Sequence, residues 1–149
     1  MLLAKIIASL CGTGYCKGGG TIAAVIYCIL WWLLPVTLLP AGWQVVIAII
    51  IGAAGTWSAS VVDKAWGKDS SKVVIDEVAG MAIGLLHLPR HWGYVLIALA
   101  LFRFFDIVKP LGIRRTEKLP TGYGVMADDI LAGCYTFIIM QLLLWIAIL

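Results

Sequence analysis

Long apolar runs separated by short polar connections are the feature that most limits the folds open to this chain. Its mean hydropathy is +1.02 and only 13% of its 149 residues are charged, against about 25% in a typical soluble domain. The charged residues gather where the apolar runs end. We therefore predict a single integral membrane domain over residues 1–149.

Five apolar segments predict an all-α, polytopic membrane helix bundle with about five membrane segments. They cover Thr21–Leu39, Trp43–Val62, Val73–Leu88, Trp92–Phe105 and Ile130–Leu149. Because a straight span needs about 20 residues, the third and fourth are short, and we expect local bilayer thinning or partial burial around them. The stretch Met1–Leu10 is compatible with an additional interfacial helix, since Lys5 and Ser9 share one helical face.

The basic residues indicate how such a bundle would be oriented. Of the 11 lysines and arginines, ten fall on one side of the predicted topology and only Arg90 falls on the other. The positive-inside rule makes the first side cytoplasmic, and an odd number of spans then places the C-terminus on the opposite side. The net charge of +3 is small for a nucleic-acid-binding protein. We expect the lipid bilayer as partner and no nucleic acid.

The carboxylates need a separate explanation, because acidic residues contribute little to topology. All eight lie at the ends of apolar runs: Asp63, Asp69, Asp76, Glu77, Asp106, Glu117, Asp128 and Asp129. Carboxylates at the mouth of an apolar bundle are costly to desolvate and require a partner. A divalent cation is a suitable partner for several of them at once.

Two acidic pairs stand out among these carboxylates. Asp76-Glu77 begins the third segment, where the helix dipole also favours negative charge, so this pair alone leaves both interpretations open. Asp128-Asp129 opens the fifth segment after the flexible stretch 120–124. One Asp would suffice as a helix cap, and two adjacent carboxylates repel each other unless a cation lies between them. We therefore favour metal coordination at the second pair.

The end of the fourth segment carries a cation, a carboxylate and a second cation at intervals of three residues. Arg103, Asp106 and Lys109 share one face if the helix continues through them. A structural ladder of ion pairs is one explanation. However, Arg103 lies inside an apolar run, where an arginine is expensive without a purpose. Arg and Lys both suit a phosphate head group, which is the second explanation.

A glycine-rich stretch over 12–21 precedes the first segment. Backbone amides in such a stretch can cradle an anion, but the glycine, lysine and hydroxyl spacing of a P-loop is absent. Taken alone, this stretch favours a hinge or an interfacial loop.

Four sequence blocks, taken in order, resemble the phosphatidylglycerophosphatase A family. The blocks are Gly12-x-Gly14 with Gly20-Thr21, Val74-Ile75-Asp76-Glu77-Val78-x-Gly80, Phe102-Arg103-x-x-Asp106-x-x-Lys109-Pro110, and Gly122-x-Gly124-x-Met126-x-Asp128-Asp129-x-x-Ala132-Gly133. The resemblance implies a Mg²⁺-dependent lipid phosphatase of the inner membrane. Its substrate would be phosphatidylglycerophosphate, and its products phosphatidylglycerol and inorganic phosphate.

The resemblance also assigns roles to residues. Catalytic and metal-binding roles fall on Asp76, Glu77, Asp106, Asp128 and Asp129, and Asp69 fits the catalytic pattern. Phosphate-binding roles fall on Arg103 and Lys109, to which we add Lys17 and Thr21. Family members commonly carry Pro-Gly-Thr where this chain has Gly19-Gly20-Thr21. We therefore predict a more flexible loop, with Lys17 as an added phosphate contact. Attack by water and a carboxyl-phosphate intermediate both remain open at this point.

Two other classes of membrane protein cluster carboxylates in a similar way. A CDP-alcohol phosphotransferase needs Asp-Gly-x-x-Ala-Arg followed by Gly-x-x-x-Asp-x-x-x-Asp, and this motif is absent. A small cation transporter needs carboxylates near the middle of the membrane, whereas the predicted topology puts them at one face.

Overall fold

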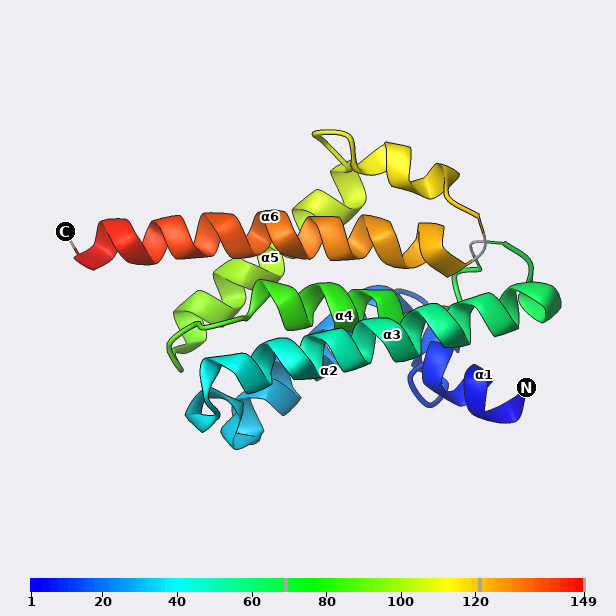
Figure 1. Ribbon diagram of the computed structural model, residues 1–149, viewed down its shortest axis with the longest axis horizontal. Coiled ribbons are helices and arrows are strands. Elements are labelled where there is room, and N and C mark those ends of the chain that lie inside the picture. The colour runs from blue at the N-terminus through cyan, green and yellow to red at the C-terminus, as the bar shows by residue number, and fades with distance from the viewer. Residues whose placement is uncertain (69, 121, 149) are drawn as a thin grey trace.

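The computed structural model describes residues 1–68, 70–120 and 122–148 of the chain, and these residues form helices without strands (Figure 1). The α-helices are α1 (Leu2–Ala8), α2 (Gly19–Leu33), α3 (Ala41–Trp66), α4 (Ile75–Gly84), α5 (Trp92–Val108) and α6 (Gly122–Ile148). Short 3-10 helices cover Thr13–Tyr15, Pro35–Leu38 and Ile113–Lys118. The prediction of an all-α bundle is confirmed.

Most of the predicted segments contain a helix, but several boundaries were wrong. The segment predicted to end at Leu39 leaves the α-helix at Leu33, because Leu34 precedes a proline and takes an extended conformation. Helix α3 continues past the predicted end at Val62 to Trp66, where Gly67 (φ 84°) terminates it. Helix α4 is only 10 residues long, and a turn that includes the buried Leu85 and Leu88 carries the chain on to α5.

The largest correction concerns the start of α6. The stretch 120–124 was predicted to be a flexible connection, yet the helix already begins at Gly122. Gly122 packs against α3 so closely that an added Cβ would lie 2.5 Å from the Ser60 nitrogen and 2.8 Å from the Ala59 Cβ. Without a side chain, the glycine lets the first turn of α6 form against α3. Asp128 and Asp129 therefore lie in the second turn of α6 and do not open it.

Two helices in the described residues, α3 and α6, are long and apolar enough to cross a membrane. The prediction of about five membrane segments is not confirmed. Helix α4, with 10 residues, rises only about 15 Å, half the thickness of a bilayer core. On α3 and α6 alike, large apolar side chains point outward, including Ile49, Ile50, Leu142 and Trp145.

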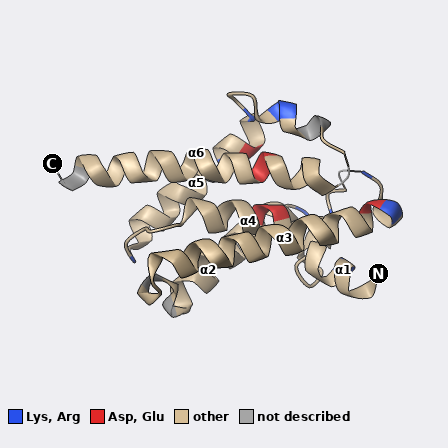
Figure 2. Cartoon of the chain, viewed as in Figure 1, with Lys and Arg blue, Asp and Glu red and all other residues tan. Residues whose placement is uncertain are grey.

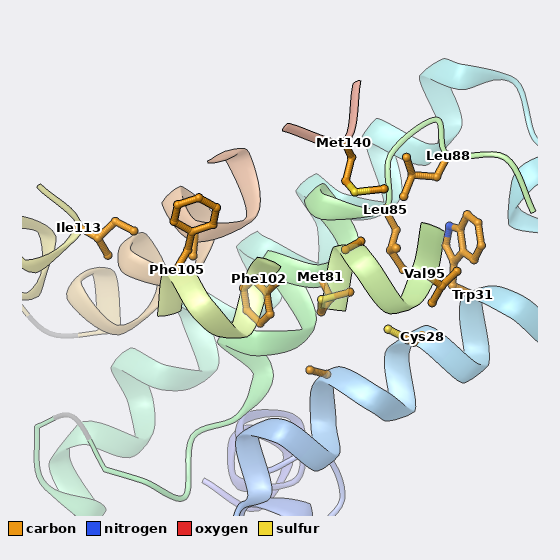
Figure 3. Packing of buried hydrophobic residues seen from close by; sticks show 13 residues of the cluster. Cys28, Trp31, Met81, Leu85, Leu88, Val95, Phe102, Phe105, Ile113 and Met140 are labelled. Carbon is orange, nitrogen blue, oxygen red and sulfur yellow. The ribbon is translucent and has the colours of Figure 1, made fainter. Parts of the chain in front are cut away.

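Helix α4 lies at the centre of the bundle and contacts α2, α3, α5 and α6. Its residues take part in both apolar clusters of the core. One cluster packs Met81 and Leu85 against Phe102 of α5 and Cys28 and Trp31 of α2 (Figure 3). The other packs Val78 and Ala79 against α1, α3 and α6. The start of this short helix is thus held from all sides, and Asp76 and Glu77 are fixed with it.

The crossing of α4 and α6 depends on glycines in both helices. A Cβ on Gly133 would collide with the Gly80 carbonyl oxygen, and a Cβ on Gly80 would lie 2.6 Å from the Asp129 carbonyl oxygen. Gly84 faces Thr136 in the same way, one turn further along. Small residues at a helix crossing allow backbones to approach in this way.

We expect Gly133→Ala to lower the melting temperature of the detergent-solubilised protein, because the added methyl group overpacks this crossing by about 1–3 kcal/mol. Gly52→Ala is the matched control, since a Cβ there meets only the Ile130 Cδ1 at 4.0 Å. The control should melt at or above the wild-type temperature. Equal melting temperatures for the two variants would contradict the role of the crossing.

Candidate active site

Charged residues gather toward the side of the bundle that holds the chain's N-terminus (Figure 2). The acidic residues of α4, α5 and α6 that were predicted from three separate segments lie together there. Among the described residues, Arg90 is the exception to this grouping of charge. Its guanidinium donates a hydrogen bond to the Trp32 carbonyl oxygen and stacks on the Trp32 indole. The one-sided grouping expected from the sequence is therefore a property of the folded chain.

Three carboxylates form a compact cluster within this region. Asp76 and Glu77 come from the first turn of α4 and Asp129 from the second turn of α6. One oxygen of each lies within 4.8 Å of the other two. Asp76 is 8% exposed and Asp129 is 3% exposed. Three negative groups at this separation and burial repel one another strongly unless a positive charge joins them.

The unsatisfied oxygens of the cluster fit a bound cation. Glu77 Oε2 and Asp129 Oδ2 are buried and accept no hydrogen bond from the residues that the structure describes. Burial raises the pKa of the Asp76 carboxyl well above its usual range, and the charges of Glu77 and Asp129 raise it further. A hard divalent cation with oxygen ligands would relieve both effects. The donor set of Asp76, Glu77 and Asp129 therefore suits Mg²⁺.

Asp106 and Asp128, two further acidic residues predicted for the site, are each paired with a cation. Arg103 Nη1 lies 2.7 Å from Asp106 Oδ2 and 3.5 Å from Glu77 Oε1. Lys109 Nζ donates to Asp128 Oδ2 at 2.5 Å. The prediction that Arg103 and Asp106 share a helical face is confirmed. Lys109, however, caps α5 in the left-handed region (φ 49°), which breaks the helical register. Its side chain therefore reaches Asp128 of α6.

A cavity of about 630 Å³ joins these groups. Its wall includes most of the residues predicted for the site: Lys17, Thr21, Asp76, Glu77, Arg103, Asp106, Lys109, Asp128 and Asp129. Lys17 and Thr21 are exposed at its edge. Asp69, the remaining predicted site residue, lies outside the described residues.

The glycine-rich stretch forms one wall of the cavity and is closely packed there at Gly14 and Gly20. A Cβ on Gly14 would collide with the Lys72 carbonyl oxygen, and one on Gly20 would collide with the Glu77 carboxylate. Gly18 (φ 76°) caps the N-terminus of α2 and turns the chain into the helix. The first-turn amides of α2 lack helical acceptors. They lie at the cavity, where they can meet an anion.

Sequence reasoning missed two parts of the cavity wall. Gly20 leaves the space that the Glu77 carboxylate fills, and no local pattern in the sequence reports such a distant contact. The segment Ser70–Val73 also lines the cavity. Its polar residues directly precede the Asp76 helix, and that position was an available signal.

Oxygen ligands for a hard cation, placed beside an arginine, a lysine and free helix amides, are the groups with which proteins bind phosphate esters. The fold and the site thus define a helical protein that can hold a cation and a phosphate in one cavity. Comparison with known proteins gives the family. The chain belongs to the phosphatidylglycerophosphatase A family, whose model matches residues 6–144.

Named relatives agree with the family but differ in the lipid that they are named for. A protein of Bacteroides thetaiotaomicron, provisionally named a phosphatidylinositol-3-phosphatase, is 42% identical over 92% of this chain and 93% of its own length. The phosphatidylglycerophosphatase A of Escherichia coli is 34% identical over 76% of the chain and 65% of its own length. That of Haemophilus influenzae is 47% identical over 48% of the chain and 45% of its own length. No solved structure matches the chain.

We expect Mg²⁺ to raise the melting temperature of the wild-type protein and not of Asp129→Asn. A cation bound only by the folded state adds about 2.7 kcal/mol at a hundred-fold excess over its Kd, and the variant lacks one of the three ligands. The measurement is thermal unfolding in detergent with and without Mg²⁺, in the absence of substrate. Asp63→Asn, which removes a charge outside the cluster, is the control and should keep the wild-type increase. An equal increase in Asp129→Asn would exclude the cluster as the cation site.

Proposed function

We propose that the protein hydrolyses phosphatidylglycerophosphate to phosphatidylglycerol and phosphate, with Mg²⁺ as cofactor, at the cytoplasmic face of the inner membrane. The observation that carries this proposal is the Asp76–Glu77–Asp129 cluster, which shares one cavity with Arg103 and Lys109. Membership of the phosphatidylglycerophosphatase A family supports the lipid phosphatase activity.

Asp76, Glu77 and Asp129 would hold the Mg²⁺ by carboxylate oxygens. When bound, Mg²⁺ polarises phosphate oxygens and lowers the pKa of water. Asp106 and Asp128, for which the family resemblance also implies metal-binding roles, hold Arg103 and Lys109 in ion pairs at the cavity wall. We propose that the main role of Asp106 and Asp128 is this ion pairing, which orients Arg103 and Lys109 toward the phosphate.

Five groups of this chain would bind the phosphate. Arg103 offers a planar donor fork, and Lys109 offers a point charge. The amides at the start of α2, with Thr21 and Lys17 beside them at the cavity edge, supply donors from the opposite wall. Together they neutralise charge that spreads over the transferring phosphoryl group.

A carboxylate that is not fully engaged would accept the proton of the attacking water. Glu77 takes this role only where the cation leaves its Oε2 free, because Oε1 faces Arg103 and Oε2 has no partner among the described residues. Asp69 remains the second candidate on sequence grounds.

The outer surface of the bundle supports the bilayer placement that we propose. Helices α3 and α6 expose large apolar side chains, including Ile49, Ile50, Leu142 and Trp145, over their length. With the basic end of the bundle on the cytoplasmic side, the cavity would open at that interface and the acyl chains of the substrate would remain in lipid. The C-terminus would then lie on the opposite side.

The choice of head group is the open question, because the Bacteroides relative is named for a phosphatidylinositol 3-phosphate substrate. Phosphatidylglycerophosphate and phosphatidylinositol 3-phosphate would both present a phosphate monoester to the phosphate-binding groups of the cavity. We expect Mg²⁺-dependent phosphate release from phosphatidylglycerophosphate to exceed release from phosphatidylinositol 3-phosphate and phosphatidic acid in mixed micelles. Faster release from the inositol lipid would assign the chain to that substrate. Cation flux in liposomes without any phosphate release would instead favour a transporter.

We expect Asp76→Asn and Asp129→Asn to abolish phosphate release while the folded protein is retained, because each removes a carboxylate of the cluster. A loss of 10² or more is reasonable for a group that acts on transition-state charge. Size-exclusion chromatography in detergent checks the fold, and Arg114→Ala, an exposed cation outside the cavity, is the control. Near-normal turnover in either carboxylate variant would remove that residue from the site.

A further inference from the structure

A second concave surface runs along the outer side of α3, away from the catalytic cavity. The part nearer the charged end of the bundle, here called the upper part, has a volume of about 750 Å³. Its lining includes Thr56, Trp57, Ser60, Lys64 and Tyr123. Its lower part, of about 470 Å³, is lined by Val45, Ala48, Ile49, Gly52, Ala53, Thr56, Ile83, Leu86 and Ile130. Ala53 and Thr56 belong to both parts, so the two form one groove, which we call the α3 groove.

Helix geometry makes the α3 groove continuous. Its residues on α3 recur every three or four positions from Val45 to Lys64, and this spacing keeps them on one face over about 28 Å. On α6, Tyr123 lines the upper part and Ile130, two turns later, lines the lower part. Both helices therefore follow the groove along its length.

The seam between α3 and α6 separates this groove from the catalytic cavity. Gly55 and Met126 meet there, so that a Cβ on Gly55 would lie 2.6 Å from the Met126 Cε and 3.4 Å from the Ile75 Cγ2. Gly122 and Ser60 close the seam at the charged end. None of the carboxylates of the cluster lines the α3 groove.

The small residues of α3 divide into two sets at this seam. Gly55 lies on the packed side of α3, against Met126 and Ile75. Gly52 instead faces open space, with only Ile130 Cδ1 at 4.0 Å from the position of a Cβ, and Ala53 is exposed. Absence of side-chain volume at these two positions creates the lower part of the groove.

The polarity of the α3 groove changes along its length. At the charged end it presents the Lys64 ammonium and the Tyr123 hydroxyl, and within the described residues neither group has an ion pair or a side-chain hydrogen bond. Toward the middle of the bundle its lining is almost entirely apolar. The Thr56 hydroxyl, the one hydroxyl among the described residues of this lining, donates to the Gly52 carbonyl oxygen at 2.8 Å.

We propose that the α3 groove is a binding site for an anionic phospholipid, distinct from the catalytic cavity. An acyl chain would lie over Gly52 and Ala53, and the head-group phosphate would meet Lys64 and Tyr123. Charge complementarity and the position of the groove on the two helices long enough to cross a membrane select this occupant. The site does not depend on the phosphatase activity, since it uses no residue of that cavity.

The test uses the full chain in detergent, titrated with dioleoyl-phosphatidylglycerol or dioleoyl-phosphatidylcholine, with bound lipid counted by native mass spectrometry. We expect Ala53→Leu to remove binding of both lipids at this site, because leucine fills the groove. Ala100→Leu, which adds the same bulk to an exposed position of α5, is the matched control and should bind as wild type. Lys64→Ala should weaken phosphatidylglycerol binding about five-fold and leave phosphatidylcholine unchanged.

Two further variants make the outcome decisive. Lys68→Ala removes an exposed cation at the same end that lines neither pocket and should keep wild-type binding. Asp129→Asn should also keep it, which separates this site from product bound in the catalytic cavity. Unchanged lipid binding in Ala53→Leu, or an equal loss in Ala100→Leu, would overturn the proposal. So would a dimer in the spectrum that Ala53→Leu dissociates, because the groove would then hold a second copy of the chain.

Discussion

The close crossing of α4 and α6 is the constraint on which the rest of the site depends. Gly80 and Gly133 bring the two backbones together at the point where Asp76, Glu77 and Asp129 meet. Any side chain at either glycine would separate the helices and the carboxylates with them. Apolar packing on every side of α4 holds this arrangement against the repulsion of three buried acids. The same burial makes a bound cation valuable, because a low-dielectric surrounding strengthens its attraction to the carboxylates.

Four of the other charged residues that line the cavity form two ion pairs. Asp106 pairs with Arg103, and Asp128 pairs with Lys109. Each cation is therefore held by a carboxylate outside the Asp76–Glu77–Asp129 cluster. Breaking such a pair leaves a partly buried charge without its partner, which is more costly than the pair is stabilising. The geometry therefore separates two kinds of acidic residue that look alike in the sequence. One kind is free to bind a metal, and the other positions the groups that face a phosphate.

The sequence predicted the helical class, the one-sided grouping of charge and most of the charged residues in the cavity wall, because hydropathy and charge position are local properties. It did not predict how the five acids divide, since the Lys109–Asp128 pair depends on a left-handed residue at the end of α5. The start of α6 was missed because Gly122 and Gly124 favour a turn in isolation, and only contact with α3 makes a helix there. The packing of Gly20 on Glu77 joins residues 57 positions apart in the sequence. No short-range pattern contains that information.

The small residues of α3 have different roles on the two sides of this helix. Because both sides share the seam between α3 and α6, the outer groove is connected to the side that carries the catalytic cavity. Gly55 accepts Met126 of α6 and so helps to hold the seam behind Ile75, the residue that begins α4. Gly52 and Ala53, less than one turn away, leave a groove where lipid can lie against the same seam. An acyl chain in that groove would bury apolar surface on α3 and α6 together, and burial of this kind favours the packed arrangement of both helices. Lipid bound outside would thus stabilise the contact that holds α6, and Asp129 with it, against α4.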